Sequence, residues 1–386
     1  MSDRTEPTPA LDQIALWALA CVAAATVGQM LLKPPPVAGG PADLPAISAV
    51  RALAQWDAGW YANIADNGYG ASFDPGQQSP VAYFPLYPML IRALSSVGVN
   101  KWVAGTLLSF FFGIAAIVVF SRWARRVGLR LAQPDQQAAA LAPWLLAAWP
   151  FAGYLFGVMY SDSLFLALAC SAFLAVEKDR PVLAGALGAL ATLTRPVAPA
   201  LVVGLFLRSL EVRRASKQRF GFRDFFPLAA GMGLLGYMAF LQHRFGDPLA
   251  FAHVHGAPGW DQAAGWKTWF KLSFFEQLFP RVAPLVAARL VGHALAAFFA
   301  LALAVLTVRR LGWAYGLYCL IAVGLPMLSS KDFQGMGRYA MAAFPAFLTL
   351  ATALTRRPRL ARPWVLASAG LALALAFAFG AGGYVA

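Results

Sequence analysis

Five short groups of polar and aromatic residues could carry chemistry in this sequence. The first is centred on Asp57, which follows Trp56 and precedes Trp60 and Tyr61. Burial among aromatic rings raises the pKa of a carboxylate, and a nearby cation lowers it. Once ionised, such a group can accept the proton of a substrate hydroxyl. A helix N-cap, or a solvated acid on an amphipathic helix, would satisfy the same pattern, so both interpretations stay open.

The second and third groups are turns that open helices. Residues 83–88 read Tyr-Phe-Pro-Leu-Tyr-Pro, and the two prolines favour a turn leading into a short helix. This segment, with Tyr87, is either an aromatic wall for a lipid or sugar or a membrane re-entry turn. Asp162 lies in the Tyr-Ser-Asp-Ser run that precedes an apolar stretch, a pattern typical of N-caps. A helix N-terminus at this place also favours anionic groups.

Two arginines form the remaining groups. Arg195 lies between two short apolar runs, and Arg338 follows Lys331 and Asp332 ahead of another. A guanidinium near a bilayer needs an anion, and it binds the oxygens of a lipid phosphate in pairs. Alternatively, Arg195 pairs with an acid such as Asp162 or extends to the interface, and Arg338 is an ordinary loop charge.

Metal and nucleotide chemistry have weaker support. His253 and His255, with His243 and Asp247 nearby, could offer ligands, but they form no recognised metal motif. The sequence contains no P-loop, no dinucleotide-binding glycine pattern and no Asp-x-Asp pair. Three cysteines lie inside apolar runs and are expected to be core residues. We therefore expect no cofactor and assign no metal ligand, and metal dependence stays open.

The composition identifies the setting of these groups. The 386 residues are 60% hydrophobic and 12% charged, with a mean hydropathy of +0.61. A soluble domain carries about 25% charged residues, so this is an all-α polytopic membrane protein. The net charge of +14 reflects basic cytoplasmic loops. Nucleic-acid binding is excluded, because no basic patch is interleaved with stacking aromatics in a polar domain.

Eleven apolar runs have lengths that suit membrane helices. We expect one domain, residues 1–386, with about 11 transmembrane helices and a retained first helix that is no cleaved signal peptide. The predicted spans are residues 13–33, 102–121, 137–154, 160–176, 181–194, 196–209, 224–242, 284–308, 312–329, 338–355 and 363–384.

Loop charges predict the orientation. With a cytoplasmic N-terminus, the inner loops hold 18 basic and 5 acidic residues, whereas the outer segments hold 11 and 9. This asymmetry is the one that the positive-inside bias requires. Two outer loops are long, residues 33–101 and 243–283. Aromatic and apolar residues recur at helical spacing over residues 47–68, which predicts helices lying in the membrane interface. All five groups then face the outside of a multi-pass cell membrane.

Taken in order, these motifs resemble the PIG-V family of mannosyltransferases. The similarity is carried by AQWDAGWYANIADNGY, AYFPLYPMLIRAL, YSDSLFLALA, ATLTRPVA and GRYAMAAFP, and by GDPLAFAHVHGAPGW, between about residues 51 and 346. The resemblance implies a GT-C glycosyltransferase fold with interfacial helices in the first outer loop. It also implies inverting transfer of mannose from polyprenyl-phosphate mannose to a lipid- or glycan-linked acceptor. Asp162 stands where glutamate is frequent in the family.

The resemblance matches Asp57 to the acid that GT-C enzymes place on the acceptor side, which makes it the candidate catalytic base. Arg195 and Arg338 are expected to bind the donor phosphate on chemical grounds. Sugar or acceptor contacts are expected from Trp56, Trp60, Tyr61, Asp162 and Tyr87. A lipid or glycan transporter, or flippase, is the main alternative, although the sequence has no repeated halves. A non-catalytic assembly subunit is a third.

Overall fold

The computed structural model describes residues 10–32, 43–131, 133–279 and 283–385, and every regular element in these ranges is a helix. The predicted all-helical class is therefore confirmed for the described part. Expectations for the N-terminal residues, for residues 33–42 of the first outer loop and for residues 280–282 of the second lie outside the described residues. The longer helices are α1 (Leu11–Leu32), α5 (Lys101–Gly128), α6 (Gln136–Ala147), α7 (Asp162–Glu177), α8 (Pro181–Thr192), α9 (Ala198–Ala215), α10 (Met232–Phe245), α14 (Pro284–Leu311), α15 (Trp313–Ser329), α17 (Pro345–Thr355) and α18 (Pro358–Gly380).

Five helical segments in the described ranges are long and apolar enough to cross a membrane: α1, α5, α14, α18 and the continuous segment of η3 (Phe222–Gly231) with α10. The chain is therefore a multi-pass membrane protein. Each of the eleven predicted spans falls on one or more helices, but α6, α7, α8, α15 and α17 have 17 residues or fewer and are shorter than a full span. The total of eleven crossings stays a prediction.

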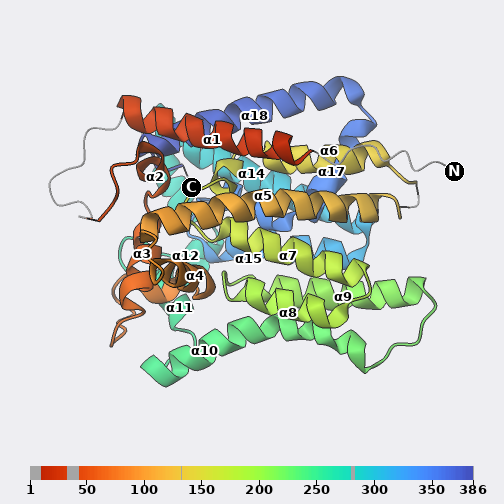
Figure 1. The fold of residues 1–386 in the computed structure, drawn as a ribbon, viewed down its shortest axis with the longest axis horizontal. Helices are drawn as coiled ribbons and strands as arrows, with labels where there is room; N and C mark the ends of the chain where they lie inside the picture. Colours follow the sequence, from red (N-terminus) through yellow and green to blue (C-terminus); the bar gives the residue numbers. More distant parts are fainter. Residues whose placement is uncertain (1–9, 33–42, 132, 280–282, 386) are drawn as a thin grey trace.

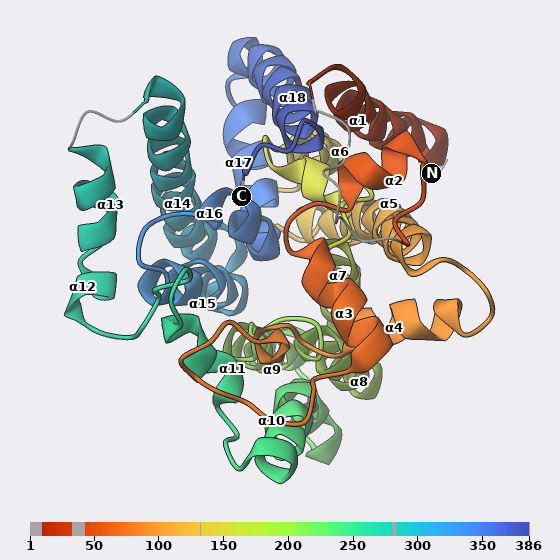
Figure 2. The same ribbon diagram turned by 90° about the vertical axis from the view of Figure 1, so that its left-hand side faces the viewer.

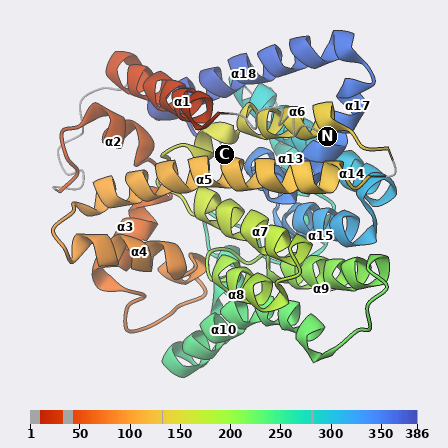
Figure 3. The ribbon, with the colours of Figure 1, turned by 45° about the vertical axis from the view of Figure 1, so that its right-hand side comes forward.

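The longer helices run side by side, and the short helices gather at one end of this bundle (Figure 1). We call it the short-helix end; Figure 2 looks onto it, and Figure 3 shows α2, α3 and α4 there from another side. The short elements are α2 (Ser48–Leu53), α3 (Ala58–Asn67), η1 (Pro80–Ala82), α4 (Leu86–Ser95), η2 (Ala152–Leu155), α11 (Ala250–His253), η4 (Val254–Gly256), α12 (Trp266–Trp269), α13 (Leu272–Leu278), α16 (Met336–Tyr339) and η5 (Ala340–Ala343).

The loops after α5, α9 and α17 lie at the opposite end of the bundle, which we call the basic end (Figures 1 and 3). Arginine pairs occupy the last turns of α5, α9 and α14, namely Arg125–Arg126, Arg213–Arg214 and Arg309–Arg310. Cations in a last helical turn interact favourably with the helix dipole.

Small residues set the contact between the first and last helices. A Cβ added to Gly28 of α1 would lie 2.1 Å from the carbonyl oxygen of Phe377 in α18, and one added to Gly380 would lie 1.9 Å from that of Ala25. Membrane helices approach closely where such small residues face each other. The α1–α18 pair consequently closes one side of the bundle.

Candidate functional site

The segment between α1 and α5 is kinked at the residue that precedes Asp57. The sequence predicted continuous helical character over residues 47–68, but α2 ends at Leu53 and α3 begins at Ala58. Trp56, between them, has a φ of +54°, a conformation that costs a non-glycine residue about 1–2 kcal/mol. Such strain persists only where the surroundings impose it. The predicted helical character is therefore present in α2 and α3, and the break between them, which the spacing did not indicate, gives Asp57 its position.

Asp57 occupies the N-cap position of α3, yet its side chain makes no cap hydrogen bond. Its Oδ1 instead accepts a hydrogen bond of 3.2 Å from the Tyr83 hydroxyl, and its Oδ2 lies 3.8 Å from Arg338 Nη1. Its backbone N–H donates to Tyr160 Oη at 3.1 Å. The capping interpretation is therefore wrong, because the carboxylate turns toward residues from other parts of the chain.

Burial raises the pKa of Asp57, while the charge of Arg338 and the hydrogen bond from Tyr83 oppose that rise. About 28% of the side chain remains exposed. The carboxylate is thus reachable by a substrate and is held next to a cation that favours its ionised form.

Asp162 begins α7 and is only 5% exposed. The preceding Ser161 provides no side-chain cap, and the Asp162 carboxylate accepts a hydrogen bond from Arg195 Nη1. Its Oδ1 also lies 3.8 Å from Arg338 Nε. The structure thus realises the intramolecular partner that the sequence left open for Arg195, and it brings Asp162 together with Asp57 around Arg338.

Arg338 lies in α16 between these two carboxylates. Its guanidinium carbon stands 5.5 Å, 4.9 Å and 5.0 Å from the ring centres of Tyr154, Tyr160 and Tyr339, at cation–π distance. Its buried Nε has no hydrogen-bond partner among the described residues. A second oxyanion could therefore be accommodated, since an arginine offers five N–H donors.

Aromatic rings line the outer side of the carboxylates. Trp60 stacks on Tyr83 with centroids 5.7 Å apart and an interplanar angle of 17°, and it meets Trp260 of the second outer loop at 5.9 Å. Trp56 is 50% exposed. The structure thus places Trp56 and Trp60 beside Asp57, where a sugar ring could stack.

Tyr61 and Tyr87 lie deeper. The Tyr61 hydroxyl is 3.1 Å from Ser161 Oγ, and Tyr87 is fully buried behind Tyr61 with its ring centroid 5.0 Å away. The Tyr87 hydroxyl donates to the Gly105 carbonyl and shares a hydrogen bond with Ser109. The structure therefore does not bring Tyr87 to the exposed surface of the site. Tyr87 instead supports the aromatic rings of the site from behind.

The histidines of the second outer loop lie outside the cluster described above. His253 Nδ1 is 2.7 Å from Asp247 Oδ2, and His255 packs against Trp260 with ring centroids 5.6 Å apart. The described residues contain no group of three or more histidine, cysteine or acidic side chains that could hold a metal ion. All three cysteines are buried and unpaired, as the sequence predicted.

The structure adds residues that the sequence did not assign to the site. Tyr83 was expected only as part of an aromatic turn, and Tyr154 gave no signal, since an apolar stretch surrounds it. Arg289 and Tyr384 also lie next to the site, with Arg289 Nη1 donating to the Tyr384 carbonyl at 3.1 Å. An arginine inside an apolar span is a functional signal by itself, so Arg289 could have been found from the sequence.

The chain is similar to solved structures over nearly its whole length. It shares 14% identity and a TM-score of 0.44 with the apo form of the oligosaccharyltransferase of Archaeoglobus fulgidus, covering 95% of this chain and 56% of that one. It shares 12% identity and a TM-score of 0.46 with ArnT from Cupriavidus metallidurans bound to undecaprenyl phosphate, covering 97% and 77%. The chain thus spans about half the length of the archaeal enzyme. No protein-family model and no curated protein sequence matches.

Proposed function

We propose that this chain is an inverting membrane glycosyltransferase of the GT-C type that moves a mannosyl residue from polyprenyl-phosphate mannose to a lipid- or glycan-linked acceptor. The observation that carries the proposal is the meeting of Asp57 and Arg338 at 3.8 Å. This pair combines an accessible base with a cation that has an unused donor. The ordered motifs of the PIG-V family supply the sugar and the carrier.

Asp57 acts on the acceptor side. It takes the proton of the acceptor hydroxyl as that oxygen attacks the anomeric carbon. Its raised pKa, caused by burial, strengthens it as a base, while Arg338 and Tyr83 favour its ionised form. The strained backbone at Trp56 fixes the direction of the carboxylate, which is the kind of positioning that bimolecular transfer requires.

Arg338 acts on the donor side. As the bond between the anomeric carbon and the phosphate oxygen breaks, negative charge develops on the departing polyprenyl phosphate. A guanidinium already placed there stabilises that charge without reorganising. Arg195 has a supporting role, because its hydrogen bond to Asp162 commits part of its charge. In-line attack inverts the configuration, so a β-linked donor gives an α-linked product.

The aromatic wall holds the sugar. Trp60, Tyr83 and Trp260 present stacked or tilted rings next to Asp57. Aromatic faces of this kind suit the apolar face of a hexose and leave its hydroxyls to the polar groups. We assign Trp56 and Trp60 to this contact, and the deeper Tyr61 supports the rings from behind. The short-helix end faces the outside of the cell, because the arginine-rich helix ends lie opposite and are typical of cytoplasmic loops.

The test is transfer by the purified protein in detergent or lipid, without an ion gradient. Labelled polyprenyl-phosphate mannose and a membrane-lipid extract should give a labelled product, whereas polyprenyl-phosphate glucose serves as the sugar control. Product from the glucose donor alone would overturn the assignment of mannose as the transferred sugar. Gradient-dependent movement of lipid with no product from any donor would replace the enzyme with the transporter.

A further inference from the structure

The chain returns to the site after its last helix. Residues 381–385, which we call the return segment, turn back at Gly382, whose φ is +87°. The turn is closed by hydrogen bonds of 2.9 Å from Gly382 N to the Phe379 carbonyl and from Gly383 N to the Ala378 carbonyl. The half-buried return segment consequently lies near α16 at the short-helix end (Figures 1 and 2).

Tyr384 ties the return segment to both sides of the site. Its ring meets Trp56 edge-on with centroids 4.8 Å apart, and its carbonyl accepts the hydrogen bond from Arg289. Burial raises the pKa of Tyr384 to about 12, and the charge of Asp57 adds to that rise while Arg338 opposes it. The segment therefore lies within electrostatic range of the proposed catalytic pair.

Three buried nitrogens around the return segment lack hydrogen-bond partners within the described residues: Arg289 Nε, Arg338 Nε and His293 Nε2. His293 is 1% exposed and lies against the backbone of Val385. Its Nδ1 accepts a weak hydrogen bond of 3.4 Å from Gly337 N, next to Arg338. Leaving a buried donor unsatisfied costs about 1–3 kcal/mol, so the two guanidinium nitrogens favour an acceptor at this place.

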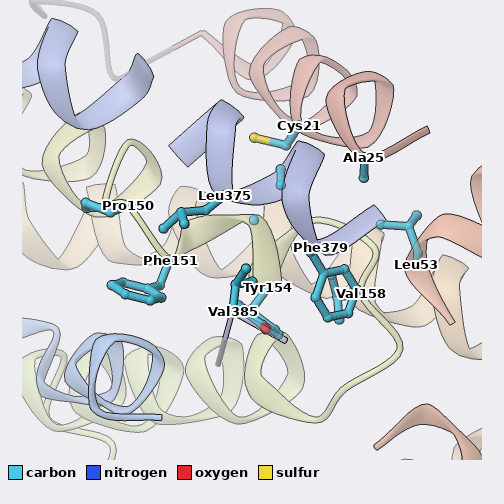
Figure 4. Close-up of a pocket in the computed structure, with 12 residues that line it drawn as sticks. Cys21, Ala25, Leu53, Pro150, Phe151, Tyr154, Val158, Leu375, Phe379 and Val385 are labelled. Atoms are coloured by element: carbon cyan, nitrogen blue, oxygen red, sulfur yellow. The ribbon is translucent and has the colours of Figure 1, made fainter. Parts of the chain in front are cut away.

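A narrow apolar crevice lies beside the return segment. It is lined by α1, α18, Leu53, the η2 region and Val385 of the return segment (Figure 4). Tyr154 lines the crevice and also lies under the Arg338 guanidinium. An apolar surface that borders a cation in this way suits an alkyl chain bearing a phosphate.

We propose that Arg289 is a second ligand for the phosphate of the lipid donor, and that the return segment is a strap whose Tyr384 carbonyl occupies Arg289 until the donor displaces it. The inference rests on the proposed function and refines its donor side. A phosphate oxygen is a stronger acceptor than a carbonyl, because both partners of the hydrogen bond are then charged. It would also satisfy the Nε donors that the strap leaves unpaired.

This exchange makes a prediction that a purely structural tail does not. A structural tail supports the site, so its removal weakens donor binding. A strap competes with the donor for Arg289, so its removal strengthens donor binding. Removal also deprives Trp56 of its edge-on partner, and turnover therefore falls while affinity rises.

The experiment measures binding of undecaprenyl phosphate to the purified full chain, with undecaprenol as the probe that lacks phosphate. Arg289→Gln should weaken phosphate binding on the order of tenfold and leave undecaprenol binding unchanged. Deletion of residues 382–386 should tighten phosphate binding several-fold in the native background and have no effect in the Arg289→Gln background. Gly382→Ala, which strains the turn and keeps the chain length, should act like the deletion if the truncated protein does not fold.

Arg244→Gln is the matched control. Arg244, in the last turn of α10, also donates to a backbone carbonyl, that of Gly70 at 2.9 Å. It should bind undecaprenyl phosphate normally. Weaker or unchanged phosphate binding after strap deletion overturns the strap, and normal binding by Arg289→Gln overturns the second ligand.

The two proposals fail differently. If phosphate binding depends on Arg289 but no donor gives sugar transfer, the proposed transferase activity is rejected and the phosphate site is retained. If sugar transfer occurs but donor affinity is unaltered in Arg289→Gln and in the deletion of residues 382–386, the strap and the second ligand are rejected and the transferase is retained. A native chain that does not bind undecaprenyl phosphate removes both.

Discussion

The two ends of α7 each carry a buried carboxylate among arginines, and the two clusters are built differently. At the basic end, Glu177 accepts hydrogen bonds from Arg130 at 2.8 Å and from Arg208 and Tyr315 at 2.6 Å. At the short-helix end, about 24 Å away along a helix of this length, Asp162 accepts one from Arg195 and leaves Arg338 at 3.8 Å.

The difference lies in unused hydrogen-bonding capacity. Both oxygens of Glu177 have hydrogen-bond partners, so the carboxylate has no oxygen free to bind a ligand. Arg208 also donates to Glu211 at 2.8 Å, and the cluster joins α5, α7, α9 and α15. The site end keeps an accessible carboxylate and unpaired guanidinium donors. Buried polar groups are normally satisfied, and the proposal is that a substrate completes the network at the short-helix end.

Asp57→Asn gives the largest expected effect on activity. The amide keeps the size of the side chain and its hydrogen bond to Tyr83 but cannot take the proton of an acceptor hydroxyl, so turnover should fall about 10²–10⁴-fold. Melting temperature should stay within the error of the native protein, since the side chain caps no helix. Transfer from polyprenyl-phosphate mannose, measured in protein of equal melting temperature, checks this; near-native turnover would remove Asp57 from the base role.

Glu177→Ala tests the cluster at the basic end, where every oxygen of the carboxylate has a partner. Removing one member of a buried ionic cluster leaves the partner cations uncompensated and typically costs about 3–5 kcal/mol. Arg208, which also packs over the Tyr315 ring at 4.9 Å, should therefore be destabilised together with the contacts of α9 and α15. Denaturant unfolding measures the loss, and donor KM in the surviving folded fraction should stay close to native. A changed KM with native stability would mean that the two ends of α7 are not separate in function.

Arg338→Lys sharpens what the site end requires. Lysine keeps the charge but loses the planar fork that binds two phosphate oxygens at once. Donor KM should rise, or kcat fall, by roughly tenfold, with a smaller effect from Arg195→Lys, since Arg195 is already bound to Asp162. Steady-state kinetics with varied donor decide it. A larger effect at Arg195 would reverse the assignment of the main phosphate ligand.

The sequence predicted the helical bundle and the residues that meet at its end because both depend on local signals. Apolar runs specify helices in a bilayer, and polar residues beside such runs are costly enough to be conspicuous. It did not predict the break at Trp56, because residues 47–68 keep helical spacing and the left-handed φ is imposed by tertiary contacts. Nor did it predict Tyr384, whose approach to Trp56 depends on how α18 packs against α1.

The smallest expected effect concerns the pH dependence of activity, and it tests whether Asp57 at the short-helix end acts as the base. Burial raises the pKa of Asp57, so kcat/KM should fall as the pH drops through a value above the ordinary aspartate range near 4. Tyr83→Phe removes a hydrogen bond that favours the ionised carboxylate, so the pKa should rise further and the acidic limb should move to higher pH. The activity at high pH should change little, because Asp57 is ionised there in both proteins.

Tyr87→Phe is the matched control, since the Tyr87 hydroxyl bonds Gly105 and Ser109 instead. An acidic limb that stays in place in Tyr83→Phe, or moves equally in Tyr87→Phe, would assign the titration to another group.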